Sequence, residues 1–391
     1  MSSKVVTGLS RLCHGEFGQF KGASLGLLAN PAAVGPDLTP AWRMIQQALP
    51  GSIKALFGPQ HGFFAEKQDN MVESGHGTHP ELGVPIYSLY GETRRPTPMM
   101  LSGLDALLVD LVDVGCRVYT FFSTLVACLE ECAEAGVEVV VLDRPNPIGR
   151  RTEGPVLPPE LMSFVGAHAI PLSHGLTLGE LAKLVVGERN LNVALTVIPC
   201  QGWDGGDFAF TGLPWVMPSP NMPTLETARV YPGQVLLEGT TLSEGRGTTR
   251  PFEIFGAPGL EPEVVAEALE PGALDGAILR PLNFEPTFHR FAGQVCGGFQ
   301  IHVTDSATYH PLRASLALLG AINRAQPGLW GLRPPPYEYE HERRPLDLLL
   351  GDAQAVDMLV AGAKAAELEA RWEDDLAVWH QRRQSNLLYP A

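Results

Sequence analysis

The sequence predicts an α/β fold in which a mostly parallel sheet comes first and an α+β region follows. Three short runs rich in Val, Leu and Ile, at residues 53–58, 104–112 and 137–142, are typical of strands buried on both faces. Strand and helix patterns alternate over the first 165 residues, as they do in βαβ units. Because a chain of 391 residues exceeds most single cores, we expect two domains, 1–165 and 166–391.

The elements of the first half follow from the hydrophobic pattern and from residues that begin or end helices. Thr97 has the position of a helix cap before Pro98, and Gly136 has the position of a residue that ends a helix. Strand patterns and helix patterns alternate along this half of the chain. The predicted elements are strands at 24–30, 53–58, 85–90, 104–112 and 137–142, and helices at 41–48, 98–101 and 121–135.

The second half is less regular. Thr177 and Glu180 have the spacing of a capping box at the start of a helix. Residues 213–250 are rich in Pro, Gly, Thr and Ser with little periodicity, which predicts a long irregular segment of functional importance. The other predicted elements are strands at 194–199 and 299–304 and helices at 312–324 and 353–383.

Composition excludes several classes of partner. A net charge of −15 argues against a nucleic-acid interface and against an anionic membrane surface. No apolar run approaches the ~20 residues that span a bilayer, and no signal peptide is visible, so a cytoplasmic protein is expected. The six cysteines lack metal-ligand spacing. We expect buried free thiols, including Cys128 and Cys132 on one helix face.

Polar residues follow each of the three apolar runs. Parallel strands bring such residues to one crevice at their carboxyl ends. His61 has the alternative role of capping its strand, Asp110 is expected to pair with a buried base, and Asp143 with Arg144 has the alternative of a structural ion pair. The residues expected in the crevice are Gln60, His61, Asp113, Asp143, Arg144 and Asn146.

Two segments of the second half are dense in hydroxyl, amide and charged groups, namely 219–224 and 238–250. Neither is a Walker-type loop, and no dinucleotide fingerprint, serine-hydrolase elbow or His-x-Glu zinc motif is present in the sequence. Glu244 and Arg246 are interpreted as part of a binding loop rather than of a surface turn. Trp203 and Trp215 are interpreted as core residues rather than as sugar-stacking ones.

Several motifs together resemble a known family over nearly the whole chain. That family is DUF1343, associated with exo-β-N-acetylmuramidases of the NamZ type (glycoside hydrolase family 171). The similar stretches are residues 57–62, 85–91, 95–98, 113–120, 142–149, 218–224, 237–240, 243–251 and 297–305.

The resemblance implies a Rossmann-like N-terminal domain, a second domain, and an active-site cleft between them. It implies release of N-acetylmuramic acid, or a related N-acetylhexosamine, from the non-reducing end of peptidoglycan fragments. The implied partner is a small carbohydrate or muropeptide, with no metal or nucleotide cofactor. Many members carry Pro-Glu-His-Gly where this chain has Gln60, and a Gln side chain cannot shuttle a proton.

Glycoside hydrolysis typically needs two carboxyl groups. Glu73 and Glu244 are the leading predicted pair, with Asp113 in reserve. Arg144 and Arg246 are expected to hold the lactyl carboxylate of the sugar, since Arg suits bidentate carboxylate binding. The remaining predicted substrate-binding residues are Gln60, His61, Tyr119, Asn146 and Asn221.

Two other functions stay open at this point. A sugar-binding or sensor protein that kept the cleft but lost hydrolysis is suggested by Gln60. A hydrolase of another small polar substrate, such as an amide, would use the same crevice. Neither the stereochemical outcome nor the oligomeric state follows from the sequence.

Overall fold

A computed structural model describes residues 5–68 and 71–390. Its first sheet is parallel except for β3, which runs antiparallel to β4, so the predicted mostly parallel sheet is confirmed. The spatial order is β3 (Gly77–Thr78), β4 (Pro85–Ser88), β2 (Ile53–Gly58), β1 (Leu25–Ala29), β5 (Ala106–Asp110), β6 (Glu138–Leu142) and β7 (Leu195–Ile198).

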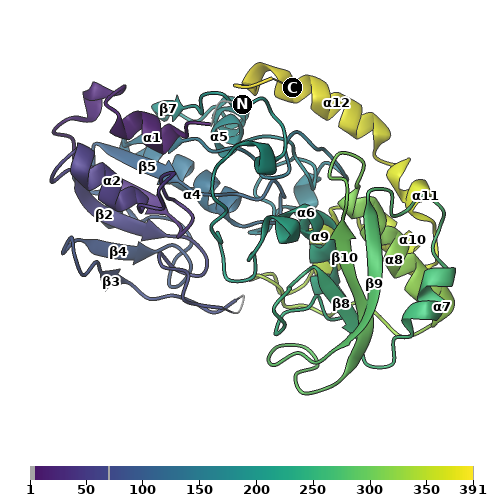
Figure 1. The fold of residues 1–391 in the computed structure, drawn as a ribbon. Coiled ribbons are helices and arrows are strands. Elements are labelled where there is room, and N and C mark those ends of the chain that lie inside the picture. The colour runs from purple at the N-terminus through teal and green to yellow at the C-terminus, as the bar shows by residue number, and fades with distance from the viewer. Residues whose placement is uncertain (1–4, 69–70, 391) are drawn as a thin grey trace.

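Helices cover both faces of this sheet (Figure 1). The helices of one face are α1 (Gly8–Cys13) and α2 (Ala41–Ala48), and those of the other are α3 (Pro98–Leu101), α4 (Phe121–Ala135) and α5 (Leu178–Arg189). Successive residues of β5 point to opposite faces, because side chains alternate along a strand. Leu108 therefore belongs to the core under α1 and α2, whereas Leu107 and Val109 belong to the core under α4.

A second, smaller sheet is antiparallel and lies in the C-terminal half (Figure 1). Its order is β8 (Ile254–Ala257), β10 (Cys296–Val303) and β9 (Ala277–Phe284). The predicted strand at 299–304 falls within β10. Helices α6 (Leu225–Gln234) and α7 (Pro262–Glu267) pack against this sheet, and α8 (Pro311–Ala325) packs against both helices.

Two predictions for the second half are wrong. The single helix expected at 353–383 is three helices, α10 (Ala353–Val360), α11 (Ala365–Glu369) and α12 (Glu373–Arg383). Gly362, at φ 96°, adopts a conformation that a helix cannot continue. The segment at 213–250 is not irregular throughout, since Thr224 caps α6 and the 3-10 helix η4 (Val235–Gly239) follows it directly.

The remaining short elements connect the larger ones. They are η1 (Gly18–Phe20), η2 (Pro159–Leu161), η3 (Phe208–Phe210), α9 (Pro345–Leu350) and η5 (Gln384–Asn386). The boundary expected near residue 165 precedes α5 and β7, which belong to the first sheet and its helices. That boundary stays a prediction.

Most of the cysteines are buried in the protein. The described cysteines are free thiols, and Cys128 and Cys132 are fully buried on α4, as expected. Desolvation raises the pKa of Cys132 to about 12, so this thiol is an inert core group. Within the described part of the chain, no helix has the length and apolar character needed to cross a membrane.

Candidate active site

A pocket lies where segments of both halves of the chain meet, and we call it the central pocket. Five of its residues were predicted from sequence to bind substrate. Two glutamates that were not predicted also line it. The polar lining residues are Gln60, His61, Tyr119, Thr120, Ser219, Asn221, Tyr231, Glu238, Arg246, Tyr337 and Glu338.

Gln60 and His61 reach the pocket because β2 ends at Gly58 and the chain then turns sharply. His61 adopts a left-handed conformation, at φ 73°, that is uncommon for a residue with a side chain. Its Nδ1 lies 2.7 Å from the carbonyl oxygen of Lys67. Such local strain is concentrated at functional sites in folded proteins. Gln60 and His61 therefore reach the pocket from the end of a strand, as the sequence predicts.

Glu338 is held in the pocket by two donors from the first half of the chain. Gln60 Nε2 donates to Glu338 Oε1 at 3.0 Å, and the Tyr90 hydroxyl donates to Glu338 Oε2 at 2.7 Å. Thr120 Oγ1 donates to Gln60 Oε1 at 2.5 Å, which fixes the orientation of the Gln60 amide. Burial raises the pKa of Glu338 above its usual range, and the two hydrogen bonds offset this only in part.

Glu238 lies in the same pocket in a different electrostatic environment. Arg246 Nη2 donates to Glu238 Oε1 at 2.6 Å, and the Tyr337 hydroxyl donates to Glu238 Oε2 at 2.6 Å. Burial by itself would raise the pKa of Glu238, but the Arg246 charge and the two hydrogen bonds outweigh burial and lower it. The pocket therefore contains one carboxyl group that favours protonation and one that favours ionisation.

Glu244 is fully buried behind Arg246 and does not line the central pocket. Its Oε1 lies 3.1 Å from Arg246 Nε and 3.3 Å from His289 Nδ1. Arg246 Nη1 is buried and has no hydrogen-bond partner among the described residues. The alternative of a surface turn for Glu244 and Arg246 is wrong, since both are buried. Arg246, which lines the pocket, thus keeps one donor that no described residue uses.

Two of the predicted catalytic residues also lie outside the lining of the central pocket. Glu73 is exposed, and its Oε1 is 3.4 Å from the Tyr339 hydroxyl. Asp113 Oδ2 accepts a hydrogen bond from Gly115 N at 2.7 Å and lies 3.5 Å from His174 Nε2. The structure therefore does not bring Glu73, Asp113 and Glu244 together in the pocket.

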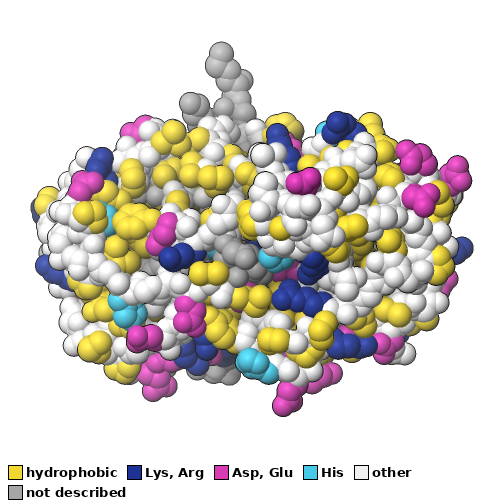
Figure 2. All heavy atoms as spheres, turned by 90° about the horizontal axis from the view of Figure 1, so that it is seen from below, with side chains coloured by type: hydrophobic (Ala, Val, Ile, Leu, Met, Phe, Trp, Pro, Cys, Tyr) yellow, Lys and Arg dark blue, Asp and Glu magenta, His cyan; other side chains and the backbone are white. Residues whose placement is uncertain are grey.

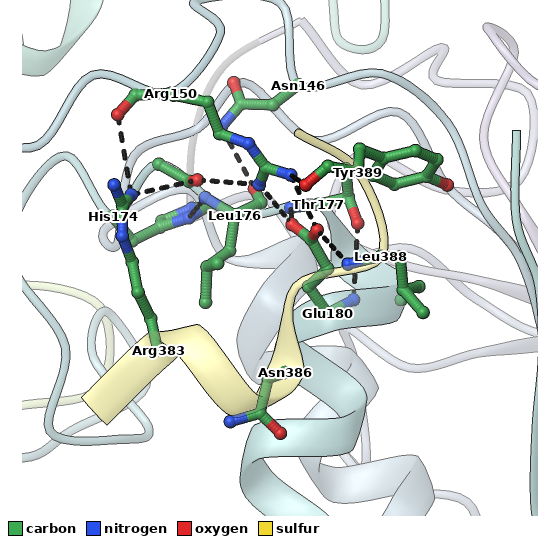
Figure 3. A network of polar contacts seen from close by, with 12 residues as sticks. Asn146, Arg150, His174, Leu176, Thr177, Glu180, Arg383, Asn386, Leu388 and Tyr389 are labelled. Carbon is green, nitrogen blue, oxygen red and sulfur yellow. Dashed lines mark hydrogen bonds and ion pairs between the residues drawn. The ribbon is translucent and has the colours of Figure 1, made fainter. Parts of the chain in front are cut away.

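Arg144 and Asn146 are engaged elsewhere. Arg144 forms a bidentate pair with Asp110, with Nη2 2.9 Å from Asp110 Oδ2, so the buried base expected for Asp110 is confirmed and the alternative Asp143–Arg144 pair is wrong. Asn146 Nδ2 donates to Leu176 O at 3.0 Å (Figure 3). Asn146 Oδ1 accepts from Ile148 N. These contacts stabilise loops at the strand ends. Neither Arg144 nor Asn146 lines the central pocket.

The crevice at the end of β6 is filled by the C-terminal segment. The Tyr389 hydroxyl donates to Asp143 Oδ2 at 2.6 Å, and Thr177 Oγ1 donates to the same oxygen at 2.7 Å. Figure 3 shows Arg150 and Glu180 holding the backbone of residues 388 and 389. Asp143 is therefore an anchor for the chain end, and burial raises its pKa to about 6.

Comparison with known proteins decides the family. Family models described as the N-terminal and C-terminal parts of exo-β-N-acetylmuramidase NamZ match residues 25–226 and 229–389. The chain belongs to the NamZ family. It is 39% identical over 388 residues to the peptidoglycan β-N-acetylmuramidase NamZ of Bacillus subtilis (strain 168), covering 99% of this chain and 92% of that protein.

Solved structures agree with the NamZ family assignment. Crystal structures of two DUF1343 family proteins from Bacteroides fragilis NCTC 9343 superpose with TM-scores of 0.88 and 0.79, at 31% and 28% sequence identity. Each comparison covers 99% of both chains. The predicted family and fold class are thereby confirmed.

Sequence reasoning missed Glu238 and Glu338 as pocket carboxyl groups. Glu238 lies within one of the motifs that carried the family resemblance, so its motif was a usable signal. Glu338 lies in a Tyr-Glu-Tyr-Glu stretch without regular periodicity, 278 residues from its partner Gln60. No local pattern connects positions that far apart.

Proposed function

We propose that this protein is an exo-acting glycoside hydrolase that releases N-acetylmuramic acid from the non-reducing end of peptidoglycan fragments. The observation that supports this most directly is a single pocket with two glutamates whose pKa values are shifted in opposite directions. Hydrolysis of a glycosidic bond needs one protonated and one ionised carboxyl group. The activity named for the Bacillus subtilis relative is the same reaction class.

The proposed pair differs from the pair that the sequence favoured. Glu338, whose pKa is raised, donates its proton to the leaving oxygen. Glu238 stays ionised, which is the state needed either to take a proton from the attacking water or to attack the anomeric carbon. The separation of the two groups on a bound sugar decides between these routes.

Arg246 is proposed to bind the lactyl carboxylate that distinguishes N-acetylmuramic acid from N-acetylglucosamine. Its Nη2 already contacts Glu238, whereas its buried Nη1 has no partner among the described residues. A carboxylate at Nη1 would form a charge-assisted hydrogen bond. His61, Gln60, Tyr119 and Asn221 supply the other polar groups of the lining, suited to hydroxyl and acetamido groups.

The test compares hydrolysis of a chromogenic N-acetylmuramide by wild type, Glu338→Gln, Glu238→Gln and Glu73→Gln. General acid–base catalysis contributes roughly 10²–10⁴-fold, so we expect losses of that size in the first two variants. Glu73→Gln is the matched control, because Glu73 is an exposed carboxylate outside the lining of the pocket. Full activity in both pocket variants would contradict the proposed roles.

A second function, sugar binding without hydrolysis, is favoured by Gln60 in place of the Glu of many relatives. Isothermal titration calorimetry with N-acetylmuramic acid, beside the hydrolysis assay, separates the two. Binding without turnover of any N-acetylhexosaminide would support the binding function. Turnover by wild type would exclude it. The cytoplasmic location expected from the sequence stays a prediction.

A further inference from the structure

A second concavity is lined by two residues of the segment that carries Glu238 and Arg246 and by residues of two distant stretches of the chain. We call it the basic concavity, and its lining residues are Thr240, Thr241, His289, Arg290, Phe291, Arg333 and Pro334. It is more open to solvent than the central pocket. Lys and Arg side chains gather near the middle of the face seen from below (Figure 2), although the whole chain carries a net charge of −15.

The backbone of residues 237–242 positions both arginines of the basic concavity. Arg290, in the loop between β9 and β10, donates through Nη1 to Thr240 O at 2.5 Å and also to Leu242 O. The backbone N–H of Arg333 donates to Gly239 O at 2.9 Å. The side chain of Arg290 and the backbone of Arg333 are thus both held by this segment, and both arginines line the basic concavity.

These guanidinium groups keep unused donors. No acceptor among the described residues is hydrogen-bonded to Arg290 Nε or Nη2. The Arg333 guanidinium has no hydrogen bond within the described chain and only faces the Tyr337 ring, 5.8 Å from its centroid. Guanidinium groups normally bind planar carboxylates or phosphates through such donors.

Positive charge is in excess around the basic concavity. The charged groups that influence Arg290 are the cations Arg246 and Arg333 and the anions Glu238 and Glu244. The lining of the concavity contains the guanidinium groups of Arg290 and Arg333 and no carboxylate, and both nearby carboxylates contact Arg246. Burial lowers the pKa of Arg290; the charge of Glu244 opposes this in part, and the nearby charge of Arg333 adds to the lowering. A bound anion would relieve this repulsion.

We propose that the basic concavity binds an anionic group, a carboxylate or a phosphate, through Arg290, Arg333 and His289. His289 lines the concavity beside Arg290, and its Nδ1 lies 3.3 Å from Glu244 Oε1. Two sources supply such a group. One is an acidic substituent on the glycan beyond the cleaved bond, and the other is a separate small anion.

The first experiment measures binding of inorganic phosphate to wild type, Arg333→Gln and Arg280→Gln by isothermal titration calorimetry. Loss of one charge-assisted donor should weaken phosphate binding roughly tenfold in Arg333→Gln. Arg280 is an exposed arginine of β9 outside the basic concavity, so its variant should bind within about twofold of wild type. Partial retention by Arg333→Lys would support a charge contact.

Absence of saturable phosphate binding to wild type, or equal weakening in both Gln variants, would overturn the inference. Phosphate binding does not require turnover, so its failure is distinguishable from failure of the proposed hydrolase function. The second experiment measures KM for N-acetylmuramides with a neutral and with a carboxylated aryl leaving group. A rise in KM confined to the carboxylated substrate in Arg333→Gln assigns the site to the substrate. Unchanged KM values with weakened phosphate binding assign it to a separate anion.

Discussion

Replacing Gln60 with Glu tests how the buried carboxyl group of Glu338 works. The change is nearly isosteric, and Thr120 Oγ1 can still donate to the oxygen at position 60, as it does now at 2.5 Å. The nitrogen that lies 3.0 Å from Glu338 Oε1 becomes an oxygen. Two carboxyl groups then share one short contact, as in the paired carboxyl groups of aspartic proteases.

The size of the effect follows from this distance. Two unit charges about 3 Å apart repel by roughly 5 kcal/mol at an effective dielectric constant of about 20. Relaxation of the side chains reduces this, and we expect the proton shared by the pair to have a pKa raised by roughly 2–3 units. Because the folded-state pKa is raised, the associated stability is present at low pH and is lost as pH rises through the new value.

Urea unfolding between pH 5 and 9 measures this effect. Between pH 5 and 8, Gln60→Glu should lose roughly 3 kcal/mol more stability than wild type does. Gln47→Glu, at an exposed position, is the control and should follow wild type. If Glu338 is the proton donor, the alkaline limb of kcat/KM should also move to higher pH. Parallel stability curves for Gln60→Glu and wild type would refute the reasoning.

Three further variants test the framework around the pocket by urea unfolding. Arg117→Met should cost roughly 3–5 kcal/mol, because it leaves four backbone carbonyls without their buried donor; a loss below about 1 kcal/mol would contradict this. Wild type should lose roughly 2–3 kcal/mol of stability as pH rises through about 6, because the pKa of Asp143 is raised. Asp143→Asn should abolish this pH dependence, and an unchanged slope of stability against pH would contradict the prediction. Gly239→Ala should cost roughly 1–3 kcal/mol and lower activity, since its Cβ would lie 2.7 Å from Leu346 Cα; Gly187→Ala, with no atom within 4 Å, is the control that should not destabilise.

The parallel sheet could be predicted because its central strands are buried on both faces and appear as apolar runs. The prediction of one helix at 353–383 was wrong because the apolar residues continue past Gly362, whose backbone conformation ends α10. Pairing of charged residues was the least predictable feature. Arg144 follows Asp143 in sequence but pairs with Asp110 of the neighbouring strand, which no sequence distance reveals.

Where strand ends and dense polar motifs deliver side chains, the sequence predicted residues that line the central pocket, as for Gln60, His61 and Asn221. The carboxyl groups that it predicted do not line this pocket. Glu244 has the same charge and lies six residues from Glu238, but the fold turns it behind Arg246. Glu238 lies in η4, which packs against α9, and packing between distant elements has no local signature in the sequence.

Gln60 therefore has a different significance from the one its sequence suggests. Taken alone, an amide in place of a carboxyl group favours loss of hydrolysis. In the structure its Nε2 donates to Glu338, whose pKa is raised mainly by burial. A glutamate at position 60 would share one proton with Glu338, whereas the amide leaves Glu338 as the only carboxyl group of this contact. The amide is thus compatible with a hydrolase that uses Glu338 as its acid, and the Gln60→Glu and Glu338→Gln variants test that arrangement from its two sides.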